Sequence, residues 1–370
     1  MFLLGSDAPT LRNYISQSLW TTTAGDRIRG RVPYIDPNAT DLDDLNAYME
    51  IQSQVMAWLG DADNYVPLQA EALARSTLSF DAGDSSEKQA VVSLIDRALS
   101  DLERDGFALA ASPYRLTERG ATARLTGLSP ASAARVSEAV ALGADSWMQD
   151  LAGLRTLDPG MAAQIAQLVF EASEVIQHSL WFRREAGSSQ AGKLSTMLRF
   201  NSESRHRRTE SDTFAADIAL FSSWIAGDSY MQLANKAPIF KNANSLFGGS
   251  NETKRTSDAA EYVGKLTYPA AWVWSGAVIV GKEHGLDIPA FVKSSIEYGV
   301  QSEAAAQLIT RGHLTRGGAV FVARECGDEW ENVSDQIGDE AQLELFSSGL
   351  TSLDYERLRD LGERLRLSVQ

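Results

Sequence analysis

The sequence contains one cysteine, no long hydrophobic run and few histidines, and each shortage excludes a class of protein. Cys326 alone cannot form an intrachain disulfide or supply a cysteine-rich zinc site. The longest apolar stretch, residues 268–280, is shorter than the ~18 residues that span a bilayer. The apolar residues at the N-terminus, Phe2 to Leu4, are too few for the core of a signal peptide. We therefore expect a cytoplasmic protein that has no contact with a membrane.

The sequence also lacks the spacings that identify most metal sites and catalytic sites. The four histidines do not form a His-x-x-x-His pair, and no Gly-x-Ser-x-Gly elbow is present. Residues 187–193 approach the phosphate-loop pattern G-x-x-x-x-G-K-[ST], but Leu194 stands where the magnesium-binding hydroxyl belongs. We therefore expect no metal, no cofactor and no catalytic residue in this chain.

The 370 residues carry a net charge of -15, from 34 basic and 49 acidic side chains. This balance is the opposite of the basic footprint of most nucleic-acid-binding proteins, but the charge is unevenly distributed. Residues 36–105 contain fifteen acidic and four basic side chains, and residues 325–363 contain twelve and two. Between residues 180 and 210 the sign reverses, with seven basic and three acidic side chains.

The basic segment 183–208 is where we expect a nucleic-acid strand to bind, because cations that pair with phosphates supply most of such affinity. The alternative is a solvated loop or a docking surface for an acidic segment of the same protein. The residues expected at the strand are Arg183, Arg184, Arg199, Arg205, His206, Arg207 and Arg208.

Apolar periodicity of about 3.6 residues predicts a mainly α-helical chain that forms a bundle. The expected helices are 42–59, 84–106, 130–142, 159–184, 212–235, 258–281 and 288–298. Large aromatic residues on such helices favour the core, so we expect Trp147, Trp181, Trp224, Trp272 and Trp274 to be buried.

Two local patterns are more specific. A helix that ends at Gly106, a short β-hairpin over 107–117 and a helix from Glu118 follow the order of a winged-helix domain, although an ordinary hairpin between helices has the same order. A helix that ends at Arg311-Gly312 and another that begins at about Thr315 predict a helix-hairpin-helix, whose turn can hold a phosphate, or an ordinary αα-hairpin. We include Arg311 and Arg316 among the expected nucleic-acid contacts.

Together these patterns resemble the C-terminal region of superfamily 2 DExH helicases of the archaeal replication-fork and polymerase-theta type. The wing of that family commonly ends in Tyr-x-x-Thr-x-x-Gly, which here is Tyr114 to Gly120. The family's helical hairpin often begins with a Tyr-Gly-Val-like stretch, here Tyr298 to Val300, but Leu314 departs from its usual Gly-x-Gly.

The resemblance implies a winged-helix domain, a ratchet-like helical bundle and a helix-hairpin-helix that guide a single DNA or RNA strand leaving the motor. The motifs of the ATPase motor are not in this sequence, so ATP and magnesium are expected only in motor domains of the same protein or of a partner subunit. The implied divisions are 1–40 for the tail of a motor domain, 41–128 for the winged helix, 129–287 for the bundle, and 288–370 for the hairpin and acidic C-terminal helices.

Two other functions fit the same sequence. The acidic faces favour a protein-interaction module that docks a basic partner. A winged helix followed by a bundle is also compatible with a transcription regulator, although residues 85–105 offer few cations for reading a DNA groove.

Overall fold

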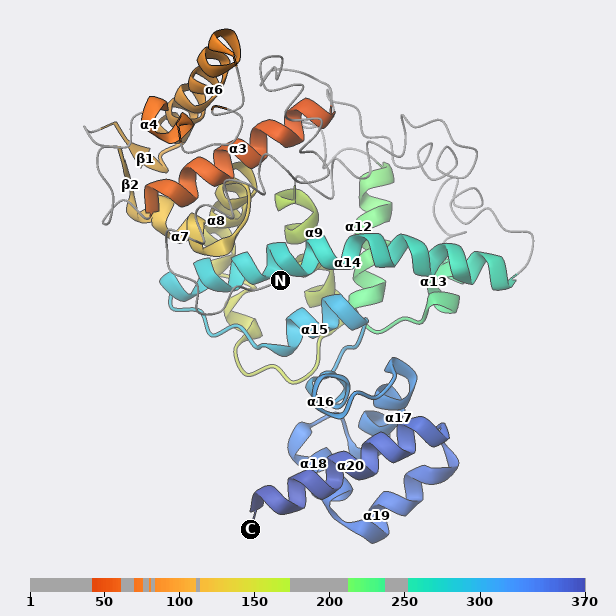
Figure 1. The fold of residues 1–370 in the computed structure, drawn as a ribbon. Coiled ribbons are helices and arrows are strands. Elements are labelled where there is room, and N and C mark those ends of the chain that lie inside the picture. The colour runs from red at the N-terminus through yellow and green to blue at the C-terminus, as the bar shows by residue number, and fades with distance from the viewer. Residues whose placement is uncertain are drawn as a thin grey trace. The chain divides into compact units, whose positions relative to one another are not determined.

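Figure 1 shows the fold of the chain in a computed structural model. The structure describes residues 42–60, 70–75, 80, 84–110, 114–173, 212–236 and 252–369. Within these ranges the chain forms fifteen α-helices and one two-stranded sheet, so the expected mainly α-helical class is confirmed. The chain divides into two compact units, residues 1–137 and 138–370, which we describe separately.

The first unit packs its helices around an apolar core that includes Val91, Ile95, Leu99 and Phe107. Between α3 and α6, the hydroxyl of Tyr48 donates a hydrogen bond to Asp101 Oδ2 at 2.5 Å, so the contact between these helices is polar as well as apolar. The helices of this unit are α3 (Leu42–Gly60), α4 (Ala70–Ala74), α6 (Ser85–Arg104) and α7 (Glu118–Thr126), and the unit boundary falls within α8 (Pro130–Ala144).

Helix α6 begins and ends where its sequence predicts. Asp84 accepts hydrogen bonds from the amides of Ser86 and Glu87, and the Glu87 carboxylate accepts one from the Asp84 amide. This reciprocal capping box satisfies amides that have no partner inside the helix. Gly106 follows the helix with φ of +76°, a conformation that favours glycine.

The strands β1 (Ala108–Leu109) and β2 (Arg115–Leu116) pair antiparallel and form the expected hairpin. Thr117 joins this hairpin to both neighbouring helices. Its hydroxyl lies 2.8 Å from the Gly106 carbonyl oxygen and accepts the Gly120 amide at 2.9 Å as the cap of α7. A Cβ atom at Gly120 would lie 2.0 Å from the Phe107 carbonyl oxygen. The Thr-x-x-Gly pattern therefore reflects a cap and a close backbone approach.

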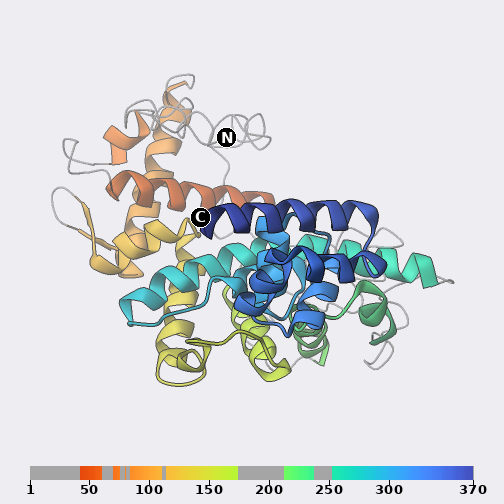
Figure 2. The same cartoon turned by 90° about the horizontal axis from the view of Figure 1, so that it is seen from below.

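The second unit contains a group of helices packed around α14, whose long ribbon is visible in Figures 1 and 2. Phe170 of α9 lies 5.4 Å from Phe221 of α12, measured between ring centroids, and both rings are buried. This group consists of η3 (Gln149–Leu151), α9 (Pro159–Ala172), α12 (Asp212–Ile225), α13 (Tyr230–Lys236), α14 (Glu252–Glu283) and α15 (Phe291–Tyr298).

Two expected helices are shorter than the apolar periodicity predicts. Helix α9 ends at Ala172, because Ser173 has an extended backbone, instead of continuing to residue 184. The expected helix 212–235 is divided into α12 and α13. Gly227 interrupts it with φ of +97°, and Ser229 and Gln232 start the next helix with a second reciprocal cap.

The remaining helices of the second unit pack against one another at its C-terminal end (Figures 1 and 2). Asp354 of α20 accepts hydrogen bonds from the Thr315 amide and the Thr315 hydroxyl, each at 2.7 Å, and so fixes the start of α17 against α20. These helices are α16 (Glu303–Gly312), α17 (Arg316–Cys326), α18 (Trp330–Gly338), α19 (Glu340–Leu345), η8 (Phe346–Ser348) and α20 (Ser352–Val369).

Candidate nucleic-acid interface

Most of the residues expected to bind a strand belong to the basic segment, which lies outside the described residues. Their contact with nucleic acid stays a prediction. They are Arg183, Arg184, Arg199, Arg205, His206, Arg207 and Arg208. The two remaining expected residues, Arg311 and Arg316, are described and have different environments.

Arg316, the first residue of α17, is surrounded by backbone carbonyl groups. Its guanidinium donates to the carbonyl oxygen of Gly299 through Nε at 3.0 Å and through Nη2 at 2.6 Å. Nη2 also lies 2.7 Å from the Gly227 carbonyl oxygen and 2.8 Å from that of Asp228. Gly299 ends α15, whereas Gly227 and Asp228 connect α12 to α13. One side chain thus holds the ends of two helices, where the partial charge of the helix is negative.

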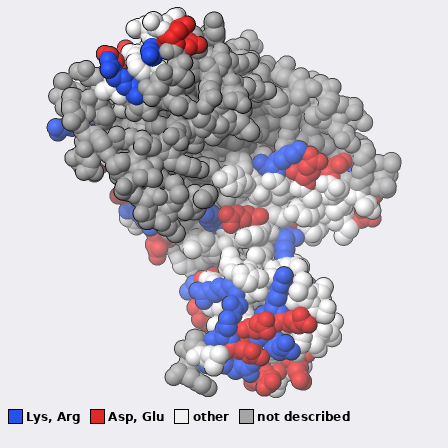
Figure 3. All heavy atoms as spheres, in the orientation of Figure 1, with Lys and Arg blue, Asp and Glu red and all other residues white. Residues whose placement is uncertain are grey.

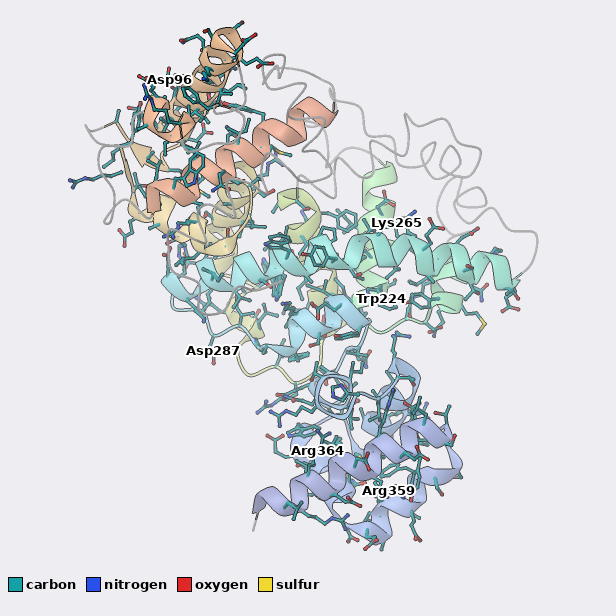
Figure 4. All side chains as sticks on the ribbon, in the orientation of Figure 1. Asp96, Trp224, Lys265, Asp287, Arg359 and Arg364 are labelled. Carbon is teal, nitrogen blue, oxygen red and sulfur yellow. The ribbon has the colours of Figure 1, made fainter. Side chains whose placement is uncertain are left out.

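An indole ring covers one face of the same guanidinium. Arg316 Cζ lies 4.8 Å from the centroid of the Trp224 ring, which stacks in turn on Tyr230 with 5.0 Å between ring centroids. Trp224, labelled in Figure 4, is buried and donates from Nε1 to the Ile296 carbonyl oxygen at 2.9 Å. Burial lowers the pKa of Arg316 from its ordinary value. The described contacts give Arg316 a structural role, and its contact with a phosphate stays a prediction.

Arg311 lies in the last turn of α16 and is exposed. Its Cζ atom lies 5.4 Å from the centroid of the Trp330 ring, a cation–π distance. Apart from this ring contact, the guanidinium has no hydrogen-bond acceptor among the described residues. Arg311 is therefore oriented by a ring and still has hydrogen-bond donors to offer.

Two further arginines, which the sequence analysis did not select, reach the same end of α16 from α20. Arg357 Nη1 donates to the His313 carbonyl oxygen at 2.7 Å, and Arg364 Nη2 donates to that of Arg311 at 2.8 Å. Their signal in the sequence is the seven-residue spacing, which places both on one face of a helix. Figure 3 shows that basic and acidic side chains are mixed on the visible face of the C-terminal helices.

Helix α14 exposes an aromatic pair. Tyr268 is 70% exposed and Trp272 is 44% exposed, and their rings meet edge to face with 5.7 Å between centroids. Lys265, labelled in Figure 4, lies one turn before Tyr268 on the same side of the helix and forms an ion pair with Glu261. These four residues, Glu261, Lys265, Tyr268 and Trp272, form a stripe along α14. The stripe exposes two aromatic rings and carries little net charge.

The expected burial of Trp272 is wrong. Trp224 and Trp274 are buried as expected, whereas Trp147 is half-buried and Trp181 lies outside the described residues. The buried face of α14 carries Tyr262, Leu266 and Trp274, among others. On a helix with 3.6 residues per turn, position 272 lies with 261, 265 and 268 rather than with that face. The periodicity of the polar residues could have revealed this stripe, but the continuous apolar run obscured it.

A buried acid of the second unit is Asp217, which is only 3% exposed between α12 and α14. Burial raises its pKa to about 8, and a hydrogen bond from the Tyr262 hydroxyl at 2.8 Å opposes this shift. The other carboxylate oxygen has no hydrogen-bond partner among the residues that the structure describes. We assign Asp217 to the core and not to the interface.

Among the described residues, no group of three or more histidine, cysteine, aspartate or glutamate side chains could hold a metal ion. None of the helices in that part of the chain combines the length and the apolar content that crossing a bilayer requires. No protein-family model matches the chain, and no curated protein matches it.

Proposed function

We propose that this chain is the nucleic-acid-binding C-terminal region of an ATP-dependent superfamily 2 helicase, where it guides a single strand from the motor and performs no catalysis alone. The resemblance of Tyr114 to Gly120 to the end of a wing supports this proposal. The helix–hairpin–helix order of α6, β1, β2 and α7 is compatible with a winged helix, and the short turn from α16 to α17 is compatible with a helix-hairpin-helix.

The observation that carries the proposal is the exposed pair Tyr268 and Trp272 on α14. Every base has an aromatic face, so exposed rings on a long helix can stack with a single strand whatever its sequence. Such stacking contributes about 1–3 kcal/mol per base. In the helicases that this chain resembles, a long ratchet helix contacts the strand, and α14, with 32 residues, is our candidate for that helix.

Backbone chemistry supports the same place on α14. Pro269 lies between the two aromatic residues and has no amide hydrogen. It cannot donate to the carbonyl oxygen of Lys265, four residues earlier. The two exposed rings therefore lie beside a carbonyl group that lacks its usual donor within the helix.

Binding of labelled single-stranded DNA and RNA to the whole chain at about 50 mM salt tests the proposal. We expect Tyr268→Ala and Trp272→Ala each to weaken binding by about tenfold, from the loss of one stacking partner. Tyr268→Phe keeps the ring and is expected to bind like the unchanged protein. Leu345→Ala removes an exposed apolar side chain elsewhere and is the second control.

Two results would contradict the proposal. Absence of strand binding by the unchanged chain would favour a protein-interaction module instead. Equal affinity of the double variant Y268A/W272A and the unchanged chain would remove α14 from the interface.

For the basic segment, outside the described residues, we expect R205A/R207A/R208A to lower both the affinity and its dependence on salt.

A further inference from the structure

Three arginines come together at the C-terminal end of α16, at the turn into α17. Arg311 belongs to α16 itself, whereas Arg357 and Arg364 reach the turn from α20. We refer to these three residues as the turn arginines.

Each turn arginine has a fixed orientation. Arg357 is held by its hydrogen bond to the His313 carbonyl oxygen, Arg364 by its bond to the Arg311 carbonyl oxygen, and Arg311 by the Trp330 ring. A guanidinium has five N–H donors. One bond to a carbonyl oxygen leaves most of them available, and a side chain that is already ordered loses less entropy when it binds a ligand.

The turn arginines have no carboxylate within ion-pairing distance among the described residues. Asp360 lies on the same side of α20 between Arg357 and Arg364 and pairs with neither. Other arginines of this unit differ, because Arg155 pairs with Glu303 and Arg324 with Glu325.

Arg357 also influences Asp354 electrostatically and contributes to the lowered pKa of that carboxylate. No ion pair joins these two residues in the described structure. The Asp354 carboxylate is already engaged by Thr315 and Thr351. The positive charge at the turn is therefore not locally neutralised by a paired acid.

On the other side of the turn, the Asp354 carboxylate occupies part of the place that a phosphate would take. A helix-hairpin-helix holds a phosphate with backbone amides at the start of its second helix. Here the Thr315 amide donates to Asp354, and the Gly318 amide donates to the Thr315 hydroxyl at 3.2 Å. A Cβ atom at Gly318 would lie 2.8 Å from the Asp354 carboxylate, so that carboxylate occupies the space beside the Gly318 amide.

We propose that the turn arginines bind the phosphodiester backbone of the strand, and that guanidinium groups replace the backbone amides of an ordinary helix-hairpin-helix. This inference rests on the proposed function, because it names the part of the same interface that contacts phosphates. The planar guanidinium matches two phosphate oxygens at once, which an amide cannot do.

The test measures the affinity of the whole chain for a single-stranded oligonucleotide over a range of salt concentrations. Arg311→Gln and the double variant R357A/R364A change the turn arginines. R324A/R359A removes the same charge as the double variant from exposed positions, and Figure 4 labels Arg359 and Arg364 on opposite sides of the α20 ribbon. Thermal unfolding verifies that each variant folds. Arg357 and Arg364 make hydrogen bonds that contribute to packing, so R357A/R364A could change the fold. Arg311→Gln removes no such hydrogen bond among the described residues and therefore tests the inference independently.

We expect Arg311→Gln to weaken binding by about three- to tenfold and R357A/R364A to weaken it further, with a salt slope lower by about 0.7 for each phosphate that the variant no longer binds. R324A/R359A is expected to retain the affinity of the unchanged chain. Inorganic phosphate at matched ionic strength is expected to compete weakly, because it offers one phosphate where the strand offers several.

Three results would overturn the inference. The first is that the turn variants bind with the same affinity and salt slope as the unchanged chain, while Tyr268→Ala still weakens binding. That result would leave the proposed function intact. The second is complete displacement of the strand by inorganic phosphate, which would indicate a site for the free anion. The third is a lack of strand binding by the unchanged chain, which overturns the proposed function as well.

Discussion

Arg316 and Trp224 lie 4.8 Å apart, measured from Cζ to the ring centroid, and this contact joins the start of α17 to the ends of α12 and α15. The guanidinium makes four hydrogen bonds to three carbonyl oxygens, and it donates none to a carboxylate of the described residues, although the nearby Asp228 carboxylate opposes the lowering of its pKa by burial. Helix C-termini supply the negative potential that a salt bridge would otherwise provide. Gly299 makes the approach possible, since a Cβ atom there would lie 2.6 Å from the Trp224 ring.

Replacing Arg316 should therefore destabilise the second unit. Arg316→Met keeps an unbranched stem against Trp224 but removes every donor to the three carbonyl groups. We expect the free energy of unfolding to fall by about 2–4 kcal/mol, because hydrogen bonds to a charged group contribute about 1.5–3 kcal/mol each and their contributions are not additive. Urea unfolding measures this loss. Arg359→Ala, an exposed arginine of the same unit, should change stability by no more than about 0.5 kcal/mol. Equal midpoints for Arg316→Met and Arg359→Ala would show that the carbonyl contacts contribute little.

Gly120 tests the interpretation of the wing-like motif. Gly120→Ala places a methyl group 2.0 Å from the Phe107 carbonyl oxygen, which belongs to the backbone and cannot move alone. We expect this overpacking to lower the free energy of unfolding by about 2–3 kcal/mol. Gly264→Ala is the matched control, because a Cβ atom there meets nothing within 4 Å inside α14. It should stabilise the protein by about 0.5–1 kcal/mol. A neutral Gly120→Ala variant would contradict the close approach of α7 to the hairpin.

The sequence predicts the local elements well where caps, turns and period agree. For α6, the residues Asp84 to Glu87 form the capping box, and Gly106 has the left-handed conformation that the sequence suggests. Between α12 and α13 the apolar period continues across the break. The cap formed by Ser229 and Gln232 is visible in the sequence, but the period outweighed it.

The candidate site is less predictable because it depends on residues that are distant in sequence. Trp272 stands in a continuous run of apolar residues and so resembles a core residue. Only its angular position on α14 explains why it is exposed while Trp274 is buried. The partners of Arg316 are backbone carbonyl groups, whose positions no residue type encodes. Arg357 and Arg364 belong to an acidic segment by composition, yet they reach the end of α16 from another helix.

Asp217 should make the stability of the second unit depend on pH in the neutral range. Its pKa is about 8 in the folded protein and about 3.9 in an unfolded chain, so the folded state holds a proton that the unfolded state releases. Stability should therefore fall as pH rises from about 4 to 8, by at most about 1.4 kcal/mol per pH unit from this group.

Asp217→Asn should remove this dependence, since asparagine has nearly the same shape, stays neutral and can still accept from Tyr262. The measurement is the midpoint of urea unfolding at several pH values from 5 to 8. Asp287→Asn alters an exposed carboxylate of the same unit, labelled in Figure 4, and should leave the profile of the unchanged protein intact. Parallel profiles for Asp217→Asn and the unchanged protein would contradict a buried proton at this site.

Asp354 should produce the opposite dependence at acidic pH. Its burial opposes ionisation, but hydrogen bonds from the Thr315 amide, Thr315 hydroxyl and Thr351 hydroxyl lower its pKa below the ordinary value. The folded state therefore binds this proton less readily than the unfolded chain does. The carboxylate stabilises the fold above its unfolded pKa of about 3.9, and this stabilisation is lost as pH falls through the lowered folded value.

Asp354→Ala should cost about 2–4 kcal/mol at neutral pH, because the partly buried Thr315 amide loses its acceptor at the start of α17. Asp354→Asn keeps one oxygen for that amide but cannot ionise, so its loss should be smaller. The difference in unfolding free energy between the unchanged protein and Asp354→Asn should shrink as pH is lowered from 6 to 3. A constant difference would show that Asp354 joins α17 to α20 through its shape and hydrogen bonds alone, with no contribution from its charge.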